Sequence, residues 1–174
     1  GESSKIGLDP HLLSNLNPKR IMVVVPNPEW SDLRKRIPLT GESGKNFDGE
    51  IAKHGVSRDD FYICNAVRCY TNNEQPTAKH LERCEPFLRI EINLIKPKLV
   101  IAMGAIAFEQ LCPGVQFSES LKTIAKSSKF GVNVFAVHYP SPNNLKDSAT
   151  KIAFEDQIEV MCGLVTALRD PIPG

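Results

Sequence analysis

Four short apolar runs, separated by longer segments of helical character, most constrain what this chain can fold into. They cover residues 21–25, 61–65, 99–103 and 132–137 and are rich in β-branched side chains. Continuous apolar runs of this length are typical of strands buried on both faces of a sheet. Strands that alternate with helices form parallel sheets covered by helices on both faces. The sequence therefore predicts an α/β fold with three α/β/α layers around a central four-stranded parallel sheet.

Helix-capping residues and apolar periodicity place the helices between these runs. One helix is expected within residues 43–55, where Ser43 is a cap and Gly55 a stop signal. A long helix follows Pro76-Thr77 and ends before Pro97, with apolar residues at helical spacing. Two more helices are expected at residues 104–111 and 149–168. The stretch 27–44 is predicted to be a long loop, and long loops in compact domains are often functional.

Length and composition indicate one domain without a membrane-spanning segment. A chain of 174 residues with 41% hydrophobic residues suits a single core. We expect residues 1–18 to form an amino-terminal arm and residues 19–174 the domain. No apolar run reaches the roughly 18–20 residues that span a bilayer. The net charge of +1 excludes a broadly basic surface, so a contact with nucleic acid would need a local patch.

Three loops that follow strand ends carry polar residues. They contain Pro26-Asn27-Pro28, Asn65, and the segment 138–142, which reads His-Tyr-Pro-Ser-Pro. The carboxyl ends of parallel strands lie at the same edge of a sheet, and ligands bind there. The strand order alone therefore predicts that these loops meet at one pocket.

The central part of the chain resembles the uracil-DNA glycosylase superfamily, closest to its iron–sulfur branch, family 4. The resemblance rests on a glycine- and serine-containing loop followed by a strand that ends in asparagine. The matching residues, in order, are Pro38, Gly41, Ser43, Gly44, Gly55, Arg58, Tyr62, Asn65 and Cys69. The resemblance implies a monofunctional DNA glycosylase that flips uracil or a modified pyrimidine out of single- or double-stranded DNA and hydrolyses its N-glycosidic bond. It also implies a monomer in the cytoplasm, associated with the nucleoid, or in another intracellular compartment that holds DNA. The odd number of five cysteines agrees with reduced thiols there.

The resemblance implies roles for two asparagines. Asn27 and Pro28 match the asparagine–proline core of the first catalytic motif, in which the asparagine orients the attacking water. The alternative is that Asn27 forms only an Asx-turn between two prolines. Asn65 matches the residue that reads N3 and O4 of the flipped base, and its amide carries both a donor and an acceptor. The alternative is a strand-end asparagine that caps backbone groups.

The third loop departs from the usual histidine–proline–serine motif, in which histidine stabilises negative charge on O2 of the leaving base. Here Tyr139 precedes Pro140 directly, and His138 lies one residue earlier. Either His138 reaches the pocket or Tyr139 supplies the donor, because neighbouring side chains of an extended segment point to opposite faces. The resemblance assigns Pro140 and Ser141 to the DNA backbone, together with Ser43. Lys146 is expected there too, because it belongs to a basic cluster that follows the third loop, and phosphate contacts need local positive charge.

Leu39 stands where the family usually has a phenylalanine that stacks on the flipped base. A leucine provides a wider floor for the base, which leaves room for a bulkier pyrimidine. Tyr139, Trp30 and Phe47 are alternative stacking surfaces.

The resemblance also raises the question of an iron–sulfur cluster, which four cysteines hold in the family 4 branch. Cys84 matches one of these ligands, whereas the amino-terminal pair is absent and residues 99–101 replace the fourth. One ligand cannot hold such a cluster, so no cofactor and no metal are expected. Two other functions stay open: a catalytically weak module that binds DNA or a base, and a hydrolase of nucleotides.

Overall fold

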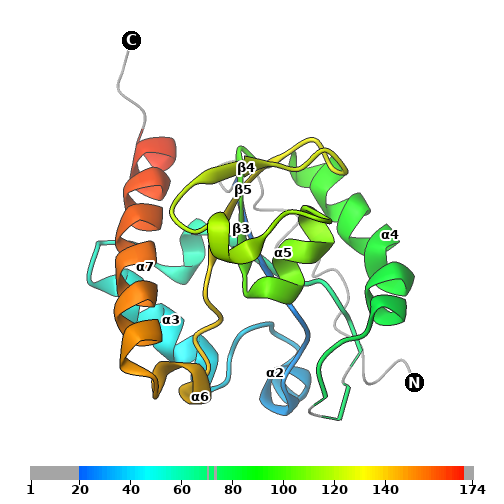
Figure 1. Cartoon of the computed structure of the whole chain (residues 1–174), viewed down its shortest axis with the longest axis horizontal. Helices are drawn as coiled ribbons and strands as arrows, with labels where there is room; N and C mark the ends of the chain where they lie inside the picture. The colour runs from blue at the N-terminus through cyan, green and yellow to red at the C-terminus, as the bar shows by residue number, and fades with distance from the viewer. Residues whose placement is uncertain (1–19, 70, 73, 171–174) are drawn as a thin grey trace.

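A five-stranded, mostly parallel sheet forms the centre of the molecule (Figure 1). The structure is a computed structural model that describes residues 20–69, 71–72 and 74–170, so the expected arm at residues 1–18 lies outside the described part. The strands stand in the order β2-β1-β3-β5-β4. Their bounds are Ile21–Val25 for β1, Tyr62–Asn65 for β2, Leu99–Met103 for β3, Ile124–Lys126 for β4 and Asn133–Val137 for β5.

The predicted α/β fold class is confirmed, and the four apolar runs form the four parallel strands. The predicted strand number is one too few, because β4 pairs antiparallel with β5 at the edge of the sheet. This strand has only three residues, and Ile124 and Lys126 are exposed. A short, solvated edge strand lacks the continuous apolar run that marks the buried strands.

Helices cover both faces of the sheet (Figure 1). Helices α3 and α7 pack on one face, and α4 and α5 on the other. Within the described residues, no helix has the length and apolar character needed to cross a membrane. The bounds are Trp30–Lys35 for α2, Glu42–Ala52 for α3, Ala78–Ile95 for α4, Ala105–Leu111 for α5, Pro142–Leu145 for α6 and Ser148–Arg169 for α7.

The alternation of side chains along each strand divides the core into two clusters. In β1, Val23 faces the cluster that contains Phe47 of α3 and Phe154 of α7. Its neighbour Val24 faces the opposite cluster, with Leu88 of α4. Both faces of the four parallel strands are therefore covered, and the polar side chains that follow these strands lie at the strand ends.

Helix α2 lies inside the stretch 27–44, which was predicted to be a loop without regular structure, so that prediction is wrong. The carboxylate of Asp32 is 2% exposed and organises the segment. It accepts hydrogen bonds from the backbone N–H of Glu29 at 2.9 Å and from that of Thr40 at 2.7 Å. An acidic residue three positions after a helix cap is the signal of a capping box, and the two neighbouring prolines masked it.

A buried ion pair joins the loop after β2 to helix α4. Arg68 pairs with Glu91, and their side chains are 4% and 1% exposed. The hydroxyl of Tyr62 donates to the other carboxylate oxygen of Glu91 at 2.6 Å. The guanidinium of Arg68 lies 5.9 Å from the ring centroid of Phe87. These contacts fix the path of the chain directly after Asn65.

Truncating one partner of this pair should destabilise the fold strongly. We expect Glu91→Ala to lower the free energy of unfolding by about 3–5 kcal/mol, because Arg68 would remain buried without its counter-charge. Urea denaturation measures the change. The control is Lys45→Ala, which breaks an exposed pair with Glu42 and should cost at most about 1 kcal/mol. Equal effects of the two substitutions would contradict a buried, desolvated pair.

Candidate active site

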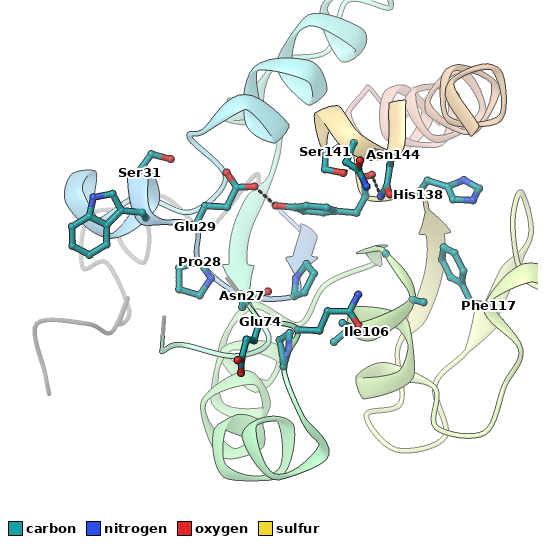
Figure 2. A pocket seen from close by; sticks show the side chains of 18 residues that line it. Asn27, Pro28, Glu29, Ser31, Glu74, Ile106, Phe117, His138, Ser141 and Asn144 are labelled. Carbon is teal, nitrogen blue, oxygen red and sulfur yellow. Dashed lines mark hydrogen bonds between the residues drawn. The ribbon is translucent and has the colours of Figure 1, made fainter. Parts of the chain in front are cut away.

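An open pocket of about 800 Å³ lies at the carboxyl edge of the sheet. Its walls come from the loops after β1, β3 and β5 and from the segment before α4. Asn27 and Pro28 lie across from Phe117 and His138 in Figure 2. The predicted meeting of the first and third loops is therefore confirmed.

Asn27 is half-buried at the pocket wall, and its side chain contacts a distant loop. The amide nitrogen Nδ2 donates to Oγ1 of Thr71 at 3.1 Å. Thr71 in turn donates to the backbone carbonyl of Glu74 at 2.5 Å. This chain of bonds ties the loop after β1 to the segment before α4, which goes beyond a local Asx-turn.

His138 follows β5 directly and borders the pocket. Its ring nitrogen Nδ1 lies 2.8 Å from the amide nitrogen of Gln157 on α7. Its ring meets the ring of Phe117 edge to face, with the centroids 5.6 Å apart. His138 is thus held from two sides, although it lies one residue before the position that the family motif predicts.

Tyr139 borders the same pocket as His138 and bonds to a carboxylate that sequence analysis missed. Its hydroxyl donates to Oε1 of Glu29 at 2.7 Å, and the hydroxyl of Ser43 donates to the same oxygen at 2.9 Å. Figure 2 shows the first bond as a dashed line from Glu29. Burial raises the pKa of Tyr139 well above its usual value, and the hydrogen bond to Glu29 and the negative charge of Glu29 add to this increase. The hydrogen bond with Ser43 acts on the pKa of Tyr139 in the opposite direction but is outweighed. Tyr139 is therefore a protonated donor at neutral pH.

Gly41 makes room for the carboxylate of Glu29. A Cβ atom at this position would lie 2.4 Å from Oε2 of Glu29 and 2.7 Å from Oγ of Ser31. In the family motif, Glu29 stands where a glycine usually follows the asparagine–proline core. No local sequence signal indicates that Glu29 contacts Tyr139, because the two residues are 110 positions apart in the chain.

Asn65 and Leu39 do not border the open pocket. Asn65 is 0% exposed, and within the described residues neither its amide nitrogen nor its amide oxygen has a hydrogen-bond partner. Leu39 is 2% exposed and packs in the core cluster on the side of α3 and α7. The strand end where Asn65 lies is thus sealed in this conformation.

The loop around Leu39 is held in an unusual backbone conformation. Leu39 has a φ of +56°, which is rare for residues with a side chain. Arg58 donates to the carbonyl of Pro38 at 2.9 Å and also to that of Leu39. A Cβ atom on Gly44 would lie 2.0 Å from the carbonyl oxygen of Leu39. Arg58 and Gly44, which carry part of the family resemblance, therefore shape this loop.

The residues assigned to the DNA backbone occupy different environments. Ser43 is buried against Glu29, and Pro140 is buried with its carbonyl accepting from Nδ2 of Asn46 at 2.9 Å. Ser141 borders the pocket and caps α6 by accepting from the backbone N–H of Asn144 at 3.1 Å. Lys146 is exposed at the carboxyl end of α6. Ser141 and Lys146 are thus the accessible members of this group.

The residues present do not fit the four-cysteine cluster of the family 4 branch. Cys84, at the matching position, is 4% exposed within α4. Across the described part of the chain, no group of three or more His, Cys, Asp or Glu side chains could hold a metal ion.

The fold and the pocket define an α/β protein that places polar side chains at the carboxyl ends of parallel strands, where such sheets bind ligands. A family model described as the uracil DNA glycosylase superfamily matches residues 13–159. The chain belongs to this superfamily.

Curated relatives include both type-4 and type-5 enzymes. A type-5 uracil-DNA glycosylase of Pyrobaculum aerophilum is 26% identical over 168 residues, which cover 78% of this chain and 74% of that protein. A type-4 uracil-DNA glycosylase of Thermotoga maritima is 32% identical over 100 residues, which cover 57% of this chain and 52% of that protein. A type-4 uracil-DNA glycosylase of Pyrobaculum aerophilum is 33% identical over 92 residues, which cover 52% of this chain and 47% of that protein. The chain thus spans about half of the length of these type-4 relatives. The predicted likeness to the family 4 branch is confirmed by these matches.

Two glycines of α3 should respond in opposite ways to substitution by alanine. Gly44→Ala should lower the free energy of unfolding by about 1–3 kcal/mol, because its Cβ would overlap the carbonyl of Leu39. Gly49→Ala is the matched control, since nothing lies within 4 Å of the added atom. It should stabilise the helix by about 0.5–1 kcal/mol. Thermal and urea denaturation measure both changes, and a neutral Gly44→Ala would show that the loop tolerates displacement.

Proposed function

We propose that this chain is a monofunctional DNA glycosylase that flips uracil or a modified pyrimidine out of DNA and hydrolyses its N-glycosidic bond. The observation that carries the proposal is the meeting of Asn27 and His138 at one pocket in a chain of this superfamily. The names of the type-4 and type-5 relatives support uracil as the first base to test. DNA is the proposed partner, and the protein is proposed to act as a monomer in an intracellular compartment that holds DNA.

In this proposal Asn27 orients the attacking water. Its amide nitrogen donates to Thr71, so the amide oxygen Oδ1 is the atom that would hold the water. An amide is too weak a base to take a proton from water in a concerted attack. It suffices when the glycosidic bond breaks first, because water then adds to a strongly electrophilic sugar.

His138 is proposed to stabilise the leaving base. A pyrimidine that leaves its sugar develops negative charge at O2, and a fixed donor in a site that excludes water lowers the energy of this state. The contacts with Gln157 and Phe117 support this role, since they fix the orientation of the ring. Tyr139 donates to Glu29 and is proposed to shape the entrance for the base.

Asn65 is proposed to read the base edge. A buried amide without partners costs about 1–3 kcal/mol, and the N3–H and O4 groups of uracil would satisfy both of its atoms. Because Asn65 is 0% exposed, the incoming base has to displace side chains that cover it. Binding would therefore include a local opening of the site.

The altered first loop, which has Glu29 in place of a glycine, and the shifted His138 favour a second candidate function, a module that binds DNA without cleaving it. The two functions separate in one experiment, in which labelled single- and double-stranded oligonucleotides containing uracil are incubated with the protein and treated with alkali. Strand breaks at uracil support the glycosylase, and retarded migration without breaks supports the binding module. His138→Ala serves as the expected inactive variant.

Asn65→Asp should change which base is accepted. The substitution replaces the amide donor by an acceptor, so the preference for uracil over a base with an amino group at C4 should fall by about 10–100-fold, as for the loss of one paired base contact. Single-turnover rates on both bases measure the effect. Asn133→Asp, at an exposed position of β5, is the matched control. Unchanged rates on every base would remove Asn65 from the recognition site.

Asn27→Ala should lower the single-turnover cleavage rate by roughly 10²-fold or more, the scale of losing one positioned catalytic group. The affinity of this variant for DNA should change little, because the residues expected to contact the DNA backbone, such as Ser141 and Lys146, are unchanged. Thr71→Val keeps the amide of Asn27 but removes the hydroxyl that accepts its hydrogen bond, so it should lower the cleavage rate by less than Asn27→Ala does. A variant that binds poorly but cleaves bound DNA at the normal rate would make Asn27 a structural turn residue.

A further inference from the structure

The buried amide of Gln157 reaches from helix α7 to the back of His138. Gln157 is 1% exposed, and it lies behind the pocket, outside the residues that border it. We propose that Gln157 is a positioning residue that fixes His138 as the tautomer with its hydrogen on Nε2. The inference rests on the proposed function, in which His138 is the donor to the leaving base.

The backbone of His138 determines which way the Gln157 amide faces. Oε1 of Gln157 accepts the backbone N–H of His138 at 2.8 Å. A backbone N–H can only donate, so exchanging the two amide atoms would set two donors against each other. The amide oxygen is thereby assigned to the backbone, and the amide nitrogen faces the ring.

The orientation of the amide then determines the tautomer of the ring. Nε2 of Gln157 lies 2.8 Å from Nδ1 of His138, and Oε1 lies farther from it, at 3.2 Å. The amide nitrogen has only hydrogens to offer, so Nδ1 has to accept. In a neutral imidazole that accepts at one nitrogen, the hydrogen is on the other. His138 therefore carries its hydrogen on Nε2.

This arrangement also accounts for a histidine that lies one residue too early. One amide holds both the backbone and the ring of His138, directly after the last residue of β5. The edge-to-face contact with Phe117 limits rotation of the ring. The ring position is thus set by α7 and by Phe117, and the proline–serine segment that follows is not needed for it.

The tautomer decides whether His138 helps or hinders departure of the base. With hydrogen on Nε2, the ring offers a neutral donor to O2, and no proton needs to be transferred. With hydrogen on Nδ1, the ring would turn a lone pair toward the developing negative charge. The wrong tautomer of a catalytic histidine is known to abolish most of its effect.

The test compares the tautomer with the cleavage rate. Protein labelled with ¹⁵N-histidine reports the protonation of each ring nitrogen by NMR, and His138→Ala assigns the signal. The wild type should show the Nε2–H tautomer. In Gln157→Glu the carboxylate accepts from the ring as well as from the backbone, so at a pH where the ring is neutral the hydrogen should move from Nε2 to Nδ1. Single-turnover cleavage should then fall by about 10²-fold, the scale of losing one donor to a developing charge, with unchanged affinity for abasic-site DNA.

A matched control separates positioning from packing. Gln110 on α5 is also buried, and its amide donates to the carbonyl of Leu81 at 3.1 Å. Gln110→Glu should destabilise the fold without altering the His138 signal or the cleavage rate of folded protein. Equal losses of cleavage in both variants would make the effect of Gln157 structural.

The remaining outcomes are also decisive. An Nδ1–H tautomer in the wild type overturns the inference, even if Gln157→Glu does not fold. A Gln157→Glu variant in which the His138 tautomer changes but the cleavage rate stays normal also overturns the inference. A wild type that cleaves no tested base refutes the proposed function instead, and the NMR spectrum still decides whether Gln157 fixes the ring.

Discussion

The parallel register of the sheet is the constraint on which the candidate site depends. Val25 of β1 pairs with Asn65 of β2, and Met103 of β3 pairs with Val137 of β5. These residues end their strands, so the polar segments that follow leave the sheet at the same edge. Backbone bonds extend the pairing beyond the strands, as between the N–H of Gly104 and the carbonyl of Val137 at 2.8 Å. A shift of one strand by one residue would exchange the side chains that face the two core clusters and displace the loop that follows the strand.

The elements that could be predicted from the sequence are those whose signal is local. A strand buried on both faces is apolar along most of its length, so β1, β2, β3 and β5 were evident as runs. Strand β4 was not, because an edge strand exposed to solvent needs no apolar run. Helix α2 was missed because Pro26 and Pro28 indicate a loop, whereas the bond from the backbone of Glu29 to Asp32 favours a helix.

The candidate site was predictable only in part, for the same physical reason. Asn27 and His138 follow strand ends, so topology brings them to one pocket. The contacts that hold them are long-range: Tyr139 to Glu29 and His138 to Gln157 join segments whose proximity appears only after folding. The burial of Asn65 is likewise a result of packing, and neither its residue type nor its position in the strand indicates it.

In the proposed function, the buried amide of Asn65 links stability to base recognition. Leaving its two polar atoms without partners costs the folded state about 1–3 kcal/mol, and a bound base would recover that amount. Extruding a base from DNA costs a few kcal/mol, and least when the base is mismatched or in a single strand. In that proposal these energies are similar, so partnering Asn65 would offset much of the cost of flipping. A base that cannot pair with the amide would gain no such compensation, so the closed strand end would favour the matching base over others.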